Sequence, residues 1–285
     1  MSWILVKLLL WGGIHFANGQ IRHPLISPAI KIQQGIGLSE VTLSYHRPAA
    51  RGRKIFGSLV PYGRIWRLGA NESTKITFSD PVQVLDQELA RGTYAFYAIP
   101  YPEQWIVIFH NNLTHWGDGR NNYRPEEDAL RVTIIPDTNA VFVEDFTIGF
   151  EHISFDAAQL VITWENTRAS IPLTFNTRAI MLEEINRQIK NNPTADTYYQ
   201  SGRYLQESGI QYEQARSYLV KANELAPDKY YIHRVWALVE AGLGNYSKAI
   251  ELARQSAFLA TREGKDEFVR MNERSVEDWK KLVRP

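Results

Sequence analysis

The spacing of apolar residues changes once along this chain, near Asn176. Before Asn176, apolar and polar residues alternate in short runs, as they do around Val41, Leu43 and Tyr45. After Asn176, apolar residues recur at helical spacing. A period of two predicts half-buried strands, whereas a period near 3.6 predicts amphipathic helices. We therefore predict an α+β protein in which a β-rich part precedes an α-helical part.

The β-rich part contains many short strand patterns with no helical pattern between them. The predicted strands are residues 41–45, 75–78, 82–85, 94–99, 105–109, 130–135, 145–150, 159–164 and 170–174. Residues 20–38, which include Pro24 and Pro28, are predicted to be a polar segment that leads into the first strand. Strands that follow one another without helical crossovers predict an antiparallel β-sandwich or barrel.

The helical part begins with one helix and continues with a sequence repeat. Ile180, Ile185 and Ile189 share one face of a helix that is predicted to end at residues 191–193. Matching residues then lie 34 positions apart: Tyr212 and Tyr246, Ala215 and Ala249, Leu225 and Leu259, Ala226 and Ala260. This period is typical of a tetratricopeptide helix pair. Two units rarely stand alone, so we expect them to dock on the strands or on the first helix. They either bind a protein or peptide partner or form a packed cap.

The first 19 residues have the pattern of a signal peptide. Lys7 precedes a mostly apolar run over residues 8–16, and Ala17 and Gly19 are small residues suited to cleavage before Gln20. The run is too short to cross about 30 Å of hydrocarbon. We therefore predict export to the periplasm or the extracellular space, with no stable membrane insertion after cleavage. The predicted parts are a signal peptide over 1–19, a β-sandwich domain over 20–175 and an α-helical, tetratricopeptide-like domain over 176–285.

Charge and composition exclude several classes of function. The net charge is +1 at pH 7, so no strong field favours nucleic acid. The chain has no cysteine, which excludes disulfides, thiol nucleophiles and thiolate metal sites. His110, His115 and Asp118 are spaced as metal ligands can be, but no fourth ligand is evident. We predict no metal and no cofactor.

One stretch, residues 44–78, is dense in arginine, glycine, proline and aromatic residues. Its cations before Glu72 are Arg47, Arg51, Arg53, Lys54, Arg64 and Arg67, and no acidic residue lies among them. A guanidinium is planar and forms paired hydrogen bonds with a carboxylate or a phosphate. Glycine permits positive φ and proline restricts φ. The stretch therefore predicts ordered turns rather than a flexible basic linker.

The string RPAARGRKIFGSLVPYGRIWRLGANESTKITFS at residues 47–79 resembles the signature of the DUF2911 family, secreted bacterial proteins of unknown function. The later segments ARGTYAFYAIP, QWIVIFHNN with Trp116-Gly117 after it, and ALRVTIIP fit the same family. The resemblance covers roughly residues 27–174 and implies a secreted β-rich domain with no established activity. His46 stands where the family pattern leads us to expect a small polar residue, so the resemblance implies no role for it.

The strands at 41–45 and 75–78 place the two ends of this stretch near each other if they pair antiparallel. The predicted ligand-binding residues are Arg47, Arg67, Asn71, Glu72, Trp66 and His46. We expect the first four to meet in space, with Phe56, Leu59 and Trp66 holding the loop to the core. Glu72 would pair with one arginine and leave another for an anion. Alternatively, these side chains only stack and satisfy loop carbonyls.

Two functions fit these features. The first is an exported, non-catalytic binding protein whose β domain takes a small anionic or sugar ligand and whose helices contact a partner protein. The second is an envelope hydrolase that uses Glu72 with His46 or Arg67. A carboxylate beside several arginines stays ionised and is a poor general acid. We therefore favour binding and predict no catalytic residue.

Overall fold

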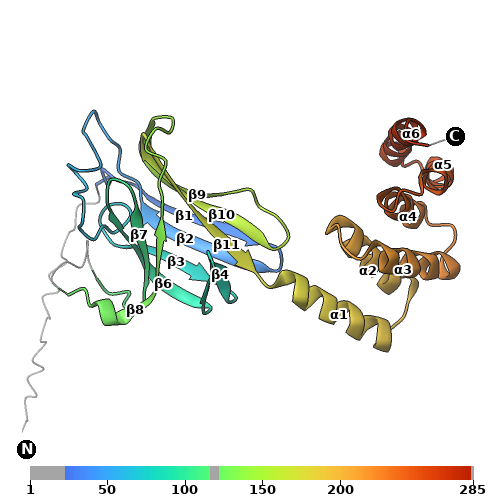
Figure 1. Ribbon diagram of the computed structural model, residues 1–285, viewed down its shortest axis with the longest axis horizontal. Helices are drawn as coiled ribbons and strands as arrows, with labels where there is room; N and C mark the ends of the chain where they lie inside the picture. The colour runs from blue at the N-terminus through green and yellow to red at the C-terminus, as the bar shows by residue number, and fades with distance from the viewer. Residues whose placement is uncertain (1–22, 116–121, 284–285) are drawn as a thin grey trace, which may run out of the picture.

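The computed structural model describes residues 23–115 and 122–283, which form two antiparallel β-sheets followed by six α-helices (Figure 1). The first sheet contains, in spatial order, β1 (Ala29–Ile36), β2 (Ser39–His46), β3 (Thr74–Phe78), β6 (Gly92–Pro100), β7 (Trp105–His110) and β8 (Asp128–Ile134). The second contains β5 (Gln87–Leu89), β4 (Val82–Val84), β11 (Thr167–Phe175), β10 (Ala157–Glu165) and β9 (Val143–Glu151). The predicted α+β class and antiparallel sandwich are confirmed, and the sheets do not close into a barrel. The predicted signal peptide lies outside the described residues.

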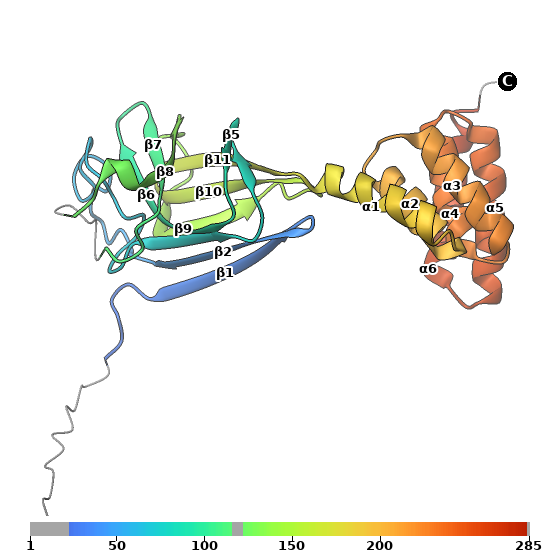
Figure 2. The ribbon, with the colours of Figure 1, turned by 90° about the horizontal axis from the view of Figure 1, so that it is seen from below.

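The two sheets pack face to face around one core (Figure 2). Alternate residues of each strand enter this core, as the burial of every second residue of β2 shows. Trp66, from the loop between β2 and β3, lies at the centre of an aromatic group. Its ring centroid is 6.0 Å from that of Trp105 on β7 and 6.0 Å from that of Trp164 on β10. The loop therefore contributes to the core that joins the sheets.

Strand β1 corrects the prediction for residues 20–38. Residues 29–36 are a strand, not a polar lead-in, and pair with β2 along its whole length, from Ala29 opposite His46 to Ile36 opposite Ser39. Lysine and glutamine alternate with the isoleucines of β1 because β1 is an edge strand with one face toward solvent. The turn between β1 and β2 requires glycine at position 37, where φ is +60° and a Cβ would lie 1.9 Å from a backbone oxygen.

The predicted antiparallel pairing of the strands at 41–45 and 75–78 is confirmed, because β2 pairs with β3 in that direction. The end of β2 and the residues directly after it lie against the edge of β9 in the other sheet. The Tyr45 hydroxyl donates to the carbonyl of Ile148 (3.1 Å) and accepts from its N–H (3.0 Å). Arg47 donates from Nε to the carbonyl of Phe146 (3.1 Å) and from Nη2 to the hydroxyl of Thr147 (2.8 Å). These bonds satisfy backbone groups that an edge strand would otherwise leave exposed.

The helices begin directly after β11. They are α1 (Thr177–Asn191), α2 (Ala195–Glu207), α3 (Tyr212–Leu225), α4 (Tyr230–Gly242), α5 (Tyr246–Arg262) and α6 (Asp266–Lys280). Ile185 of α1 packs in one cluster with buried residues of α2, α3 and α4. The expected docking of the repeat on the first helix is therefore confirmed. The sandwich core ends at Phe175, before this cluster begins.

The 34-residue repeat coincides with corresponding helices. Tyr212 begins α3 and Tyr246 begins α5, and both Ala215 and Ala249 are fully buried in these helices. Small buried residues let neighbouring helices approach closely, which matches the packing of α2 on α3 and of α4 on α5. The tetratricopeptide-like character of the segment stays a prediction. Among the described residues, no helix has the length and apolar character needed to cross a membrane.

Candidate ligand-binding site

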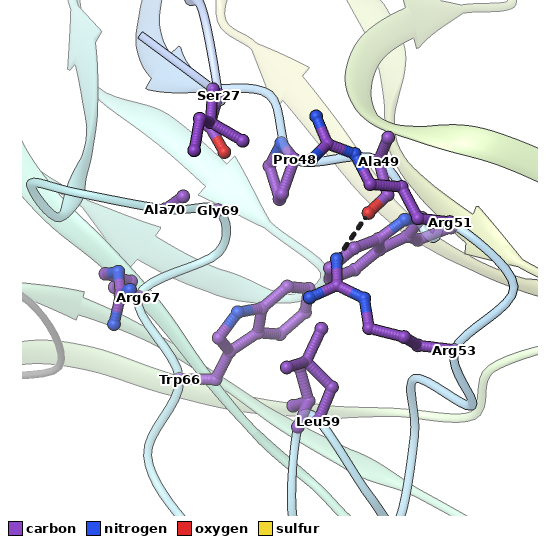
Figure 3. Close-up of a pocket in the computed structure, with 13 residues that line it drawn as sticks. Ser27, Pro48, Ala49, Arg51, Arg53, Leu59, Trp66, Arg67, Gly69 and Ala70 are labelled. Carbon is purple, nitrogen blue, oxygen red and sulfur yellow. Dashed lines mark hydrogen bonds between the residues drawn. The ribbon is translucent and has the colours of Figure 1, made fainter.

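A pocket of about 260 Å³ lies at the rim of the sandwich, beneath the loop that joins β2 to β3 (Figure 3). Its lining residues are Ile26, Ser27, Pro48, Ala49, Arg51, Arg53, Leu59, Val60, Trp66, Arg67, Gly69, Ala70 and Trp164. Most of them belong to residues 48–70, and Trp164 comes from β10 of the opposite sheet. The pocket is thus built mainly by the stretch that stood out in the sequence.

Two aromatic residues hold this loop in place. Phe56 and Trp66 are only 5% and 6% exposed, and both belong to the sandwich core. The backbone of Trp66 also pairs with Ala98 of β6, through hydrogen bonds of 2.7 and 2.9 Å in the two directions. The predicted anchoring by Phe56 and Trp66 is confirmed. Leu59, the third predicted anchor, is instead 44% exposed and forms part of the pocket wall.

Glycine allows the loop to approach the end of β2. Gly69 has φ of +141°, and a Cβ at this position would lie 2.6 Å from the carbonyl oxygen of His46. Leu68 precedes it with φ of +52° and is fully buried. This close approach places Gly69, next to the end of β2, in the pocket wall.

The side chains around the pocket carry positive charge. Arg51, Arg53 and Arg67 line it, and none of the described residues in its wall is an aspartate or a glutamate. Arg53 donates from Nε to the carbonyl of Ala50 (2.9 Å) and from Nη2 to the carbonyl of Ala49 (2.7 Å), as Figure 3 shows for the second bond. Carbonyl groups hold the guanidinium in position without cancelling its charge. The pocket is therefore suited to an anion.

The inner wall of the pocket is aromatic but mostly covered. The rings of Trp66 and Trp164 stack with an angle of 19° between their planes. Trp164 is held further by a hydrogen bond of 3.1 Å from its Nε1 to the carbonyl of Glu144. Because only 6% of Trp66 and 2% of Trp164 is exposed, little ring surface remains for a sugar to stack on. The lining favours a small anion over a neutral sugar.

Arg47 and Asn71 lie near the pocket, but each of them contacts a different part of the chain. The Arg47 guanidinium contacts β9 through the bonds to Phe146 and Thr147 described above. The side-chain amide of Asn71 contacts the carbonyl of Ser27 at 3.4 Å, a long hydrogen bond. Of the six predicted residues, Arg67 and Trp66 line the pocket. Arg51 and Arg53 were not predicted as ligands, although both belong to the same run of cations.

Glu72 and His46 do not line the pocket. Glu72 is exposed, and the ion pairs between described residues include none that joins it to Arg47 or Arg67. Its carboxylate instead acts on Lys75: burial lowers the pKa of Lys75, and the nearby Glu72 partly opposes this shift. His46 is the last residue of β2 and pairs with Ala29 in the sheet. No contact of the described residues therefore favours the hydrolase that uses Glu72.

A second polar cluster lies on the outer face of the first sheet. It brings His110 and His115 together, with ring centroids 5.3 Å apart, and adds Glu127, which the sequence prediction did not include. Asp118 lies outside the described residues. Burial and the His110 ring lower the pKa of His115, and burial together with a hydrogen bond to Asp128 raises the pKa of Tyr123 well above its usual value.

Comparison with protein-family models identifies one match. The model for DUF2911, described as a protein of unknown function, matches residues 27–173. This range is more than half of the 285-residue chain. The chain belongs to the DUF2911 family. No curated protein matches the chain.

The DUF2911 region contains both polar sites. Arg51, Arg53 and Arg67 lie within the matched range, and so do His110 and Glu127. The match ends inside β11, before α1 begins. The pocket and the histidine cluster therefore belong to the family domain, and the helices are additional to it.

Proposed function

We propose that this DUF2911 protein is an exported binding protein that holds a small anionic ligand, a phosphate or a carboxylate, in the arginine-lined pocket. The observation that supports this proposal is the composition of the wall: among the described residues that line a space of about 260 Å³, three are arginines and none is acidic. That volume lies below the usual range for drug-sized ligands, about 300–1,000 Å³. The ligand is therefore small.

Binding of inorganic phosphate and of citrate tests the proposal. We expect saturable binding by isothermal titration calorimetry and a higher melting temperature with anion present, because a ligand that prefers the folded state stabilises it. Glucose serves as the neutral comparison. A hydrogen bond to a charged group contributes about 1.5–3 kcal/mol, so Arg53→Ala should weaken anion binding about tenfold or more.

Arg64 offers a matched control for Arg53. It lies in the same loop and is exposed, but it does not line the pocket. Arg64→Ala should therefore leave the dissociation constant within about twofold of the original, since only long-range charge is lost. Equal weakening by Arg53→Ala and Arg64→Ala would indicate nonspecific attraction. Binding of glucose but not of phosphate or citrate would contradict the anion proposal.

We also propose that the helical part contacts a partner protein. The buried repeat positions in α3 and α5 support a repeat architecture, whose usual role is to present a groove to a peptide. Crosslinking in the producing cell, followed by mass spectrometry, should place partner contacts on residues 195–280. Crosslinks confined to the β-sandwich would contradict this role, and the helices would then be a cap.

A further inference from the structure

A histidine near the end of the sandwich has one ring nitrogen bound and the other without a hydrogen bond. His110, the last residue of β7, is fully buried and lies opposite Asp128 in the pairing of β7 with β8. Its Nδ1 is 2.8 Å from Oδ1 of Asp128. Its Nε2 is buried and has no hydrogen-bond partner among the described residues, although Oε2 of Glu127 lies 3.4 Å away. This nitrogen is an unsatisfied polar atom in the interior.

The surroundings of Asp128 determine which nitrogen of His110 carries a proton. The Asp128 carboxylate accepts hydrogen bonds from the Tyr123 hydroxyl, at 2.7 Å to its Oδ2, and from Nε of Arg131. In these contacts the carboxylate is the acceptor, and its Oδ1 faces Nδ1 of His110 in the same way. Nδ1 of His110 therefore donates to it. In a neutral imidazole the lone pair is then on Nε2, which faces Glu127.

Two further side chains converge on this nitrogen. His115 is 7% exposed, and its Nδ1 is also buried, with no hydrogen bond to any residue that the structure describes. One ligand atom from each of His110, His115 and Glu127 can be chosen so that all lie within 4.8 Å of one another. Asn112 donates to Oε2 of Glu127 at 3.3 Å and so restrains the carboxylate. Two imidazoles, each with one ring nitrogen that forms no hydrogen bond to a described residue, thus face a carboxylate, and all three groups can donate an electron pair to a cation.

We propose that His110, His115 and Glu127 bind a divalent transition-metal ion, with Zn²⁺ as the best-fitting case. Asp128 orients His110 through the hydrogen bond to its Nδ1. Two imidazoles and one carboxylate are a ligand set that zinc and iron(II) accept. A carboxylate that holds the second nitrogen of a ligating histidine is the usual supporting arrangement. The site is separate from the arginine pocket, because the two share no lining residue.

The separation of the donor atoms fits this ion. With bonds of about 2.0–2.1 Å, two ligands of a tetrahedral zinc ion lie about 3.3 Å apart. Nε2 of His110 and Oε2 of Glu127 are 3.4 Å apart. A hollow of about 450 Å³ opens beside the cluster and is lined in part by Asn112, His115 and Glu127. It leaves a fourth position of the ion open to water or to a small ligand.

Zinc titration of the whole protein tests this site. After removal of metals with a chelator, calorimetry should show one Zn²⁺ bound per chain, and Co²⁺ should give the visible absorption bands of a tetrahedral site. Glu127→Gln removes a ligand charge but keeps the side-chain volume, and it should weaken zinc binding at least tenfold. Glu126→Gln is the matched control, because Glu126 is the exposed neighbour of the same type. It should change the affinity less than twofold.

His115→Gln provides a second variant, which does not disturb the fully buried His110. It should also weaken zinc binding at least tenfold and abolish the cobalt bands, while circular dichroism confirms the fold. The proposal is overturned if no zinc binds with 1:1 stoichiometry, or if both variants bind as tightly as the original protein. It is also overturned if nitrogen-resolved NMR with zinc present shows protons on both ring nitrogens of His110. His110 would then be an imidazolium between Asp128 and Glu127.

Discussion

Tyr45→Phe tests how the two sheets are joined. The substitution keeps the ring, which packs edge-on against Phe146 with centroids 5.7 Å apart, and removes only the hydroxyl. That hydroxyl bonds both the N–H and the carbonyl of Ile148 on β9, and Tyr45 is 2% exposed. The change therefore leaves two backbone groups of a buried strand edge without their partner.

The expected cost follows from these two groups. A hydrogen bond contributes about 0.5–1.5 kcal/mol net, and a buried group left unsatisfied costs about 1–3 kcal/mol. Loss of the hydrogen bonds to both backbone groups of Ile148, at a site that water reaches only partly, should therefore lower the free energy of unfolding by about 2–4 kcal/mol. Because the ring stays, no comparable packing loss is expected.

Urea unfolding followed by tryptophan fluorescence measures this cost. Tyr94→Phe is the matched control: its hydroxyl makes one hydrogen bond, to the carbonyl of Ala90 at 2.8 Å. It should cost about 1 kcal/mol. If Tyr45→Phe costs less than about 0.5 kcal/mol with an unchanged denaturant slope, water replaces the hydroxyl, and the bond between Tyr45 and β9 does not hold the sheets together.

Three further changes have expected outcomes. Gly37→Ala should lower the free energy of unfolding by at least about 2 kcal/mol in the same assay, since a Cβ would lie 1.9 Å from a backbone oxygen. Gly35→Ala is the control and should cost much less, because its Cβ would meet nothing within 4 Å. A chain that ends after Phe175 should keep a cooperative thermal transition by circular dichroism, because the sandwich core ends there; aggregation would show a shared core. Arg168 lowers the pKa of Glu151, so this pair stabilises the fold above the ordinary pKa of 4.5 and loses that effect as the pH falls. Glu151→Gln should therefore lower the free energy of unfolding by less than about 1 kcal/mol at pH 7, because the pair is half exposed. The loss should become progressively smaller below pH 4.5, and a loss independent of pH would contradict this role.

Strands β1 and β2 show what sequence periodicity can and cannot predict. β2 alternates between buried and more accessible residues, and its pattern was visible from residues 41–45 alone. β1 has the same alternation, but lysine and glutamine on its outer face and two nearby prolines made it resemble a polar segment. Edge strands with one solvated face carry a weaker signal, because only half of their residues are selected for burial.

The run of cations from Arg47 to Arg67 pointed to the loop that lines the pocket, and Trp66 was correctly expected to anchor this loop. Whether the pocket binds a ligand stays a prediction. Arg67 was predicted and lines the pocket, whereas Arg47 was predicted and does not, and Arg53 lines it without having been predicted. Arg47 is satisfied by β9, about 100 positions away in the sequence, whereas Arg53 is held by carbonyls within four residues of itself.

The sequence by itself determined that a strand-rich part precedes a helical part, which stretch carries the charge, and the family. These properties follow from local periodicity, glycine and proline placement and a long motif. Only the tertiary structure decided that Tyr45 and Arg47 join the sheets, and that Glu127 lies beside His110 and His115. Contacts of this kind depend on which strand edges and which loops meet after the sheets pack. No spacing along the chain records them, because side chains from distant strands become neighbours only when the sandwich closes.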